Sequence, residues 1–157
     1  MAGRKRAYIK SNSGMGKKPK LKLPEKVSGE IKTVAFPQVK PVQGIMPDSK
    51  EEYWVALALY KLHIKFVFQY QLWGGRQYKG GQVVDFWVYT VPLPTPILVQ
   101  GWYFHYSTAE KTAQTKQNIM YLEDRLKGYA AKPVEIIDTE IPTPDDALIV
   151  VRRKLKL

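Results

Sequence analysis

The stretches GGQVVDFWV (residues 80–88) and ILVQGWYFHY (residues 97–106) decide which fold this chain adopts. Both are rich in β-branched and aromatic residues, so we predict strands at 82–89 and 97–106. The second run is apolar on both faces, which is typical of a strand in the middle of a sheet. FVFQYQL (66–72) and PVEIID (133–138) add two further predicted strands. Glycine and proline punctuate GGRQYKGG (74–81) and VPLPTP (91–96), as expected for connections between strands.

Two capping-box matches predict helices on either side of the first three strands. Ser49 with Glu52 opens a helix that should end near His63, and Ser107 with Glu110 opens one that runs to about 127. The large aromatic residues of the domain are expected to lie mostly in its core: Trp54, Phe86, Trp87, Trp102, Tyr103 and Phe104.

A last helix is predicted from Thr143 as N-cap and Pro144 in the first turn, and it continues to about Lys154. The order is then helix, three strands, helix, strand, helix. This order predicts an α/β fold with a mixed sheet that has helices on both faces. We expect this domain to span residues 49–157.

Positive charge is concentrated at the N-terminus of the 157-residue chain. The net charge is +11, and residues 1–40 hold 11 Lys and Arg against two acids. We predict a basic extended arm and a proline-containing linker over residues 1–48. Such an arm binds a phosphate backbone by releasing counterions. The expected nucleic-acid contacts in the arm and in the basic loop are Arg4, Lys5, Arg6, Lys17, Lys18, Arg76 and Lys79.

The composition excludes several classes of protein and site. Without cysteine there is no disulfide, cysteine nucleophile, thiolate zinc site or iron–sulfur cluster. No apolar run approaches the roughly 18–20 residues of a membrane-spanning helix, so we expect no membrane association. The N-terminus lacks the apolar stretch of a secretory signal, and we therefore expect a cytoplasmic location.

Asp85 is the one acid within an otherwise apolar strand. A buried carboxylate without a partner is costly, so Asp85 needs a metal, a cation or hydrogen bonds. With Glu52 on a facing helix, Mg²⁺ is a natural ligand, and His105 at the end of the next strand is suited to act as a general base. Three alternatives remain. Glu52 only caps its helix, Asp85 pairs with Arg76 or Lys79, or His105 is an ordinary strand-end residue.

GGRQYKGGQVVDFWV followed by ILVQGWYFHYS resembles nucleases of the PD-(D/E)XK superfamily and, within it, the very-short-patch-repair (Vsr-like) endonucleases. The resemblance covers about residues 49–141. It implies a restriction-endonuclease-like fold and Mg²⁺-dependent hydrolysis of DNA, with no small-molecule cofactor. The superfamily's E-x-K motif is replaced here by Gln100-Gly101-Trp102.

The resemblance also implies roles for individual residues. Asp85 and the main-chain carbonyl of Val99 would bind Mg²⁺, His105 would activate water, and Glu52 would match the first-helix acid. Gln100 takes the place of a histidine that acts near the scissile phosphate. Tyr103 and Phe104 match an aromatic pair that wedges into duplex DNA, a known mode of minor-groove binding.

Two main hypotheses follow, and a third remains. The first is a Mg²⁺-dependent DNA endonuclease encoded by a phage or mobile element, located in the host cytoplasm or the virion. The second is an inactive nuclease-fold scaffold that docks through its arm to nucleic acid or to a large assembly such as a phage particle, as a head or neck component. The altered E-x-K motif favours the second. The third is an RNA-binding protein that uses the arm and exposed aromatic residues.

Overall fold

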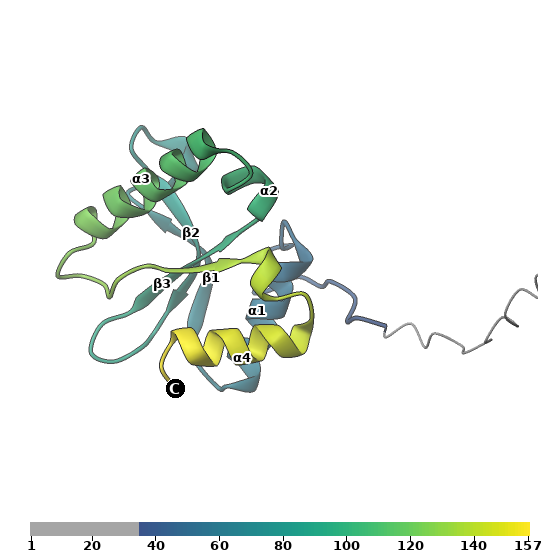
Figure 1. The fold of residues 1–157 in the computed structure, drawn as a ribbon. Helices are drawn as coiled ribbons and strands as arrows, with labels where there is room; N and C mark the ends of the chain where they lie inside the picture. Colours follow the sequence, from purple (N-terminus) through teal and green to yellow (C-terminus); the bar gives the residue numbers. More distant parts are fainter. Residues whose placement is uncertain (1–34) are drawn as a thin grey trace, which may run out of the picture. The chain divides into compact units, whose positions relative to one another are not determined.

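Four strands form a mixed sheet in the order β1-β2-β3-β4 in the computed structural model, which describes residues 35–157 (Figure 1). Their bounds are β1 Phe66–Leu72, β2 Gln82–Val88, β3 Thr95–Gln100 and β4 Val134–Ile137. The β1–β2 and β2–β3 pairs are antiparallel, whereas β3 and β4 run parallel. The four predicted strands are therefore present, and β3 occupies an interior position as expected.

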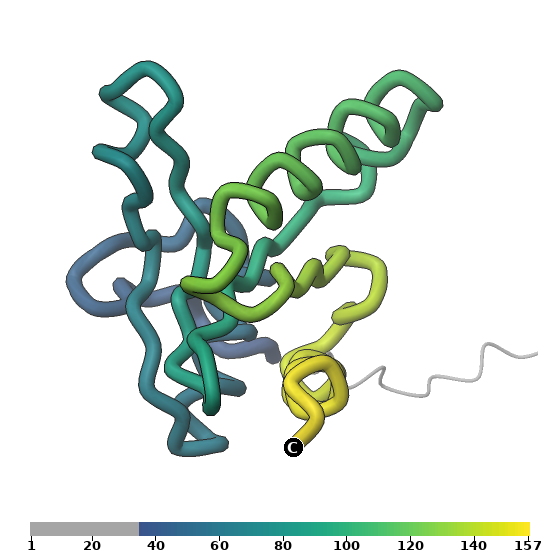
Figure 2. The backbone as a smooth tube through the Cα atoms, turned by 90° about the vertical axis from the view of Figure 1, so that its left-hand side faces the viewer, coloured from purple at the N-terminus to yellow at the C-terminus, as the bar shows by residue number. Residues whose placement is uncertain are grey.

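Helices cover both faces of the sheet. On one face lie α1 (Lys50–Lys61) and α4 (Pro144–Lys154), which pack against each other, and α3 (Ala109–Arg125) covers the opposite face. Figure 2 views α4 along its axis, on the side of the sheet away from α3. Three short helices complete the fold: η1 Gly75–Gln77, α2 Trp102–His105 and η2 Asp138–Glu140. The coarse α/β class with flanking helices is confirmed.

Each face of the sheet has its own apolar core. Residues of α1 and α4, such as Trp54 and Val151, pack with Phe68 and Phe86 on one face. Leu122 of α3 and Leu126 at its C-cap pack with Leu72, Val84 and Trp87 on the other. Within the described residues, no helix combines the length and the apolarity needed to cross a membrane.

The predicted strand 97–106 is wrong in its second half. β3 ends at Gln100, and Trp102 begins the single-turn helix α2. The Trp102 N–H donates to Asp138 Oδ1 (3.0 Å), and the N–H groups of Phe104 and His105 donate to the carbonyl of Gly101. These bonds turn the chain out of the sheet.

The turn at α2 also removes three aromatic residues from the predicted core. Trp102, Tyr103 and Phe104 are 47%, 66% and 72% exposed, whereas Trp54, Phe86 and Trp87 are buried as expected. An apolar run cannot by itself distinguish a central strand from a strand followed by an exposed turn.

The helix caps differ in detail from the predicted capping boxes. Ser49 does cap α1, and its Oγ accepts the Glu52 N–H (3.1 Å). The Glu52 carboxylate, however, accepts the N–H of Asp48 (3.1 Å). Helix α3 is capped by Thr108, whose Oγ1 accepts the Lys111 N–H (3.2 Å), and not by Ser107. Thr143 and Pro144 begin α4 as predicted.

Residues 35–48, which we expected to belong to the linker, pack against the domain. Val42 lies in the core beside α1, and the Phe36 ring lies 5.2 Å from the Trp54 ring. The Gln43 side chain donates to the carbonyl of Phe66 (2.8 Å) and accepts the N–H of Phe68 (2.9 Å). These two bonds occupy part of the free edge of β1, an edge that would otherwise be open to pairing.

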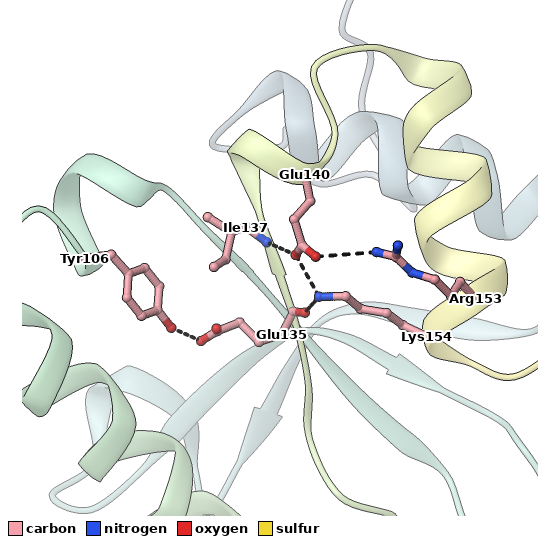
Figure 3. Close-up of polar contacts among 6 residues, drawn as sticks. All are labelled: Tyr106, Glu135, Ile137, Glu140, Arg153 and Lys154. Carbon is pink, nitrogen blue, oxygen red and sulfur yellow. Dashed lines mark hydrogen bonds and ion pairs between the residues drawn. The ribbon is translucent and has the colours of Figure 1, made fainter.

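A polar network holds the C-terminal end of β4 in place (Figure 3). The Tyr106 hydroxyl donates to the Glu135 carboxylate on one side of β4, and Lys154 Nζ donates to the Glu135 carbonyl on the other. Burial and the Glu135 carboxylate raise the pKa of Tyr106, so this hydroxyl remains a donor.

Glu140 completes this network after β4. It accepts the Ile137 N–H (3.0 Å) and Lys154 Nζ (2.6 Å), and its second oxygen lies 3.5 Å from Arg153. Burial acts to raise the pKa of Glu140, but the Ile137 N–H and the Lys154 ammonium hold it below its usual value. The network therefore fixes the position of Asp138, which lies between Ile137 and Glu140.

Candidate functional site

Asp85 lies at the point where β2 twists, so that the residues before it and after it face different cores. Phe86 belongs to the core under α1 and α4, but Val84, two residues earlier, belongs to the core under α3. Residues two apart in a regular strand share a face, so the strand is twisted over at Asp85. The facing residue on β1, Gln69, has a left-handed φ of 50°. Backbone irregularities of this kind are common next to functional sites.

The Asp85 carboxylate takes the place of a main-chain partner for β3. Pairing between β2 and β3 ends at Phe86 and Ile97, and Asp85 Oδ2 then accepts the Val99 N–H at 2.6 Å. The N–H and C=O of one residue in an extended strand point to the same edge. The Val99 carbonyl therefore lies on the edge of β3 that faces Asp85, as the predicted pair of metal ligands requires.

Glu52 approaches Asp85 from the first turn of α1. Burial and the negative charge of Asp85 raise the pKa of Glu52 to about 7. Burial likewise raises the pKa of Asp85 to about 6, although the Val99 N–H and the charge of Arg76 act to lower it. The structure thus brings two of the predicted site residues close enough to interact electrostatically.

A cavity of about 220 Å³ opens beside Glu52. Its lining includes Val99, Gln100, Gly101 and Asp138. Gln100 and Ile137 are paired in the parallel strands β3 and β4. The carboxyl ends of these strands meet at one edge of the sheet, which is where ligands bind in open α/β sheets.

Two acids near this site were not identified from the sequence. Asp138 lines the cavity and also accepts the Trp102 N–H, and the charge of Asp48 contributes to raising the pKa of both Glu52 and Asp85. The place of Asp138 at the end of the predicted strand 133–138 could have indicated it. Nothing in the sequence indicated that Asp48 lies near the site, apart from its position next to a helix cap.

His105 lies at a different cavity from Glu52. Its Nδ1 is 3.3 Å from Thr115 Oγ1 of α3, and it lines a cavity of about 290 Å³ between the sheet and that helix. Gln100 lines both cavities, and His105 does not line the one beside Glu52. His105 lies on a helix and not at the end of a strand, and its role as a base stays a prediction.

The predicted DNA-contacting residues of the domain are exposed. Arg76 and Lys79 lie at the tip of the β1–β2 hairpin, which Arg125 ties to α3 through the Gly80 carbonyl (2.6 Å) and through stacking 3.4 Å from the Trp73 ring centre. The Tyr103 and Phe104 rings lie 5.5 Å apart at 86°, and both are exposed on α2. The predicted contacts Arg4, Lys5, Arg6, Lys17 and Lys18 lie outside the described residues.

The alternative partners of Asp85 can be compared with the structure. None of the ion pairs within residues 35–157 involves Asp85, so Arg76 acts on it through charge and not through a direct ion pair. Glu52 takes part in the start of α1, since its carboxylate accepts the Asp48 N–H, and it also lies close enough to Asp85 for the charge of Asp85 to raise its pKa.

The donor set at Asp85 is compatible with Mg²⁺. In the part of the chain that the structure describes, no three His, Asp or Glu side chains gather as a metal-binding group. Mg²⁺ is commonly held by one or two carboxylates, with water and phosphate oxygens completing its octahedron. Asp85 and the Val99 carbonyl supply hard oxygen donors, and a neighbouring cation would offset the cost of ionising Asp85, whose pKa burial raises.

Comparisons of the chain with protein-family models, with curated proteins and with solved structures found no match.

Proposed function

We propose that this protein is a divalent-metal-dependent endonuclease that hydrolyses a phosphodiester bond of DNA. The observation that carries the proposal is the paired Glu52 and Asp85 at a point where β2 and β3 separate. Two carboxylates that are held close together and away from water lower the stability of the fold. Binding of a ligand is one reason for a protein to keep such a destabilising pair. The resemblance to Vsr-like nucleases fits the same residues.

In the proposed site, Asp85 and the Val99 carbonyl would hold Mg²⁺. When bound, the ion would polarise the scissile phosphate and make a bound water more acidic. Glu52 accepts the proton as the water oxygen forms its bond to phosphorus, the bond from phosphorus to the leaving oxygen breaks, and the leaving oxygen takes up a proton from solvent. Burial of Glu52 raises its pKa above the ordinary value, which favours a carboxylate that can accept a proton.

The surface around the site is suited to a nucleic acid. Tyr103 and Phe104 project from α2, which directly follows the cavity residues Gln100 and Gly101. Arg76 is close enough to the carboxylates for its charge to act on both of them. We propose that these aromatic and basic side chains hold the strand so that its phosphate lies at Asp85.

A plasmid-nicking assay tests the proposal. The full chain should convert supercoiled plasmid to the nicked form only with Mg²⁺ or Mn²⁺. Asp85→Asn should lower the rate about 100-fold or more, because even residues that support a metal ligand contribute about 10–100-fold. Asp124→Asn, an exposed acid on α3, is the matched control and should cut normally.

Two further variants assign the base. If Glu52 accepts the proton, Glu52→Gln should abolish nicking and His105→Ala should retain much of it. The reverse result would restore His105 to the role expected from the sequence. Metal-independent nicking, or equal nicking by Asp85→Asn, would contradict the proposal.

A non-enzymatic scaffold is the second candidate. The replacement of E-x-K by Gln100-Gly101-Trp102 favours it, because the site lacks the lysine and the second strand acid of the superfamily. In that case the protein would bind DNA with a steep dependence on salt, and no metal would induce nicking.

A further inference from the structure

The cavity that His105 lines is chemically unlike the carboxylate site. It lies between the sheet and α3, and its volume of about 290 Å³ is near the lower end of the range for small-molecule sites. Among the described residues that line it there is no Lys, Arg, Asp or Glu. The lining carries no permanently charged side chain, so the cavity suits a neutral ligand.

The cavity combines hydrogen-bonding groups with aliphatic walls. Gln82, Gln100 and Asn118 contribute amides, and Leu98 and Ile119 contribute apolar surface. Gln114 Nε2 donates to Asn118 Oδ1 (2.9 Å), which orients the Asn118 amide and leaves its N–H₂ group as a donor. Asn and Gln amides match the paired donors and acceptors on the edge of a nucleobase.

One of these amides is not satisfied within the described structure. Gln82 Oε1 is buried and accepts no hydrogen bond from residues 35–157. An unpaired buried acceptor costs about 1–3 kcal/mol. The terminal torsion of a glutamine is broad, so the amide can turn toward a ligand in the cavity. A ring with an N–H donor would then supply the missing partner.

Gln100 connects this cavity to the carboxylate site. It lines the cavity beside Glu52 as well as the cavity beside His105. A group that occupies the second cavity therefore lies next to whatever occupies the first. In a nucleic acid, a base and a backbone phosphate are neighbours in this way.

We propose that the cavity between the sheet and α3 binds one nucleobase that has swung out of the strand to be cleaved. The proposal rests on the proposed function, since it places the phosphate of that strand at Asp85. Enzymes that extrude a base hold it by hydrogen bonds to its edge and between apolar side chains. The aromatic residues exposed on α2, beside His105, are placed to fill the space that the base leaves in the stack.

Fluorescence of 2-aminopurine tests the proposal. Duplexes with 2-aminopurine at successive positions are mixed with the full chain without divalent metal, so that no cleavage occurs. At one position the fluorescence should rise several-fold, because an extruded 2-aminopurine is no longer quenched by stacking. Asn118→Leu, which removes an amide of the cavity, should reduce the rise at least five-fold. Gln117→Leu, the neighbouring exposed residue of α3 outside the cavity, should not.

The outcomes separate this proposal from the nuclease. Metal-dependent nicking without any rise in fluorescence would overturn the base site and leave the endonuclease standing. A rise that Asn118→Leu abolishes would support the base site even if no nicking were seen. A rise that is the same in Asn118→Leu and Gln117→Leu would overturn the base site. Equal thermal unfolding of the two variants checks that both are folded.

Discussion

At the scale of single residues, Asp85 combines a structural cost with a proposed function. Its carboxylate substitutes for a main-chain acceptor at the end of the β2–β3 pairing, and burial raises its pKa to about 6 from an ordinary 3.8. The folded protein therefore holds a proton on Asp85 that the unfolded chain releases. Because proton binding and folding are linked, the contribution of Asp85 to the free energy of unfolding falls as the pH rises from about 4 to 6.

Asp85→Asn should therefore stabilise the protein at neutral pH. Asparagine cannot ionise, and its amide oxygen can still accept the Val99 N–H, so the cost of the charge disappears. A shift of two pKa units corresponds to about 3 kcal/mol, and for a side chain that is only half-buried we expect a gain of about 1–2 kcal/mol. Urea unfolding at pH 8 measures it, with Asp124→Asn as the control. The gain should vanish near pH 4, and a gain of equal size at both pH values would contradict the argument.

The site could be predicted from its residue types but not from its geometry. Asp85 stood out as an acid in an apolar strand, and Glu52 as an acid facing it. The turn of β2 at Asp85 depends on the left-handed Gln69 of the neighbouring strand, which no local pattern indicates. Asp138 reaches the site only because β4 runs parallel to β3, so its place depended on topology.

At the scale of elements, α2 is the helix that the apolar pattern of the sequence could not predict. GWYFHY continues an apolar run, and nothing in its composition distinguishes it from the strand before it. What ends β3 is a tertiary contact, the bond from the Trp102 N–H to Asp138. The same contact exposes three aromatic side chains beside the candidate site, so the error in the predicted strand coincides with the proposed DNA-binding surface. The long amphipathic helices and the hairpin strands, whose patterns are local, were predicted within a few residues.

The N-cap of α3 provides a test at this scale. The sequence favoured Ser107, but Thr108 Oγ1 accepts the Lys111 N–H. Thr108→Ala should destabilise the protein by about 1 kcal/mol, and Thr108→Ser should restore most of it, because serine is an equally good cap. Ser107→Ala removes only side-chain bonds to Tyr103 and Lys111, neither of them fully buried, and should cost less. Chemical denaturation of the three variants measures the order, and a larger loss for Ser107→Ala would restore the cap predicted from the sequence.

At the scale of the whole molecule, charge is divided unevenly along the chain. Residues 1–34 hold ten Lys and Arg against two Glu, whereas residues 35–157 hold 15 basic and 12 acidic residues. The domain therefore has little net charge of its own, and under the proposed function its electrostatic affinity for a phosphate backbone would come largely from local clusters such as the hairpin tip. We infer that the first 34 residues supply affinity and that the folded domain supplies the chemistry.

Neutralising part of the arm should weaken DNA binding and its dependence on salt. Each phosphate contact contributes about 0.9 to the slope of log K against log salt, so a variant with Arg4, Lys5, Arg6, Lys17 and Lys18 changed to Gln should lose up to about 4.5 from that slope. The control is a full chain with an equal number of exposed domain cations changed to Gln: Lys61, Lys65, Lys132, Arg152 and Lys156. Fluorescence anisotropy over a salt series compares the two, and the full loss for five contacts of 0.9 each would be about 4.5. The arm variant should also keep its Mg²⁺-dependent nicking at low salt and high protein concentration, since Asp85 and Glu52 are unchanged. Equal slopes for the arm variant, the control and the unmodified chain would mean that the domain alone binds the backbone.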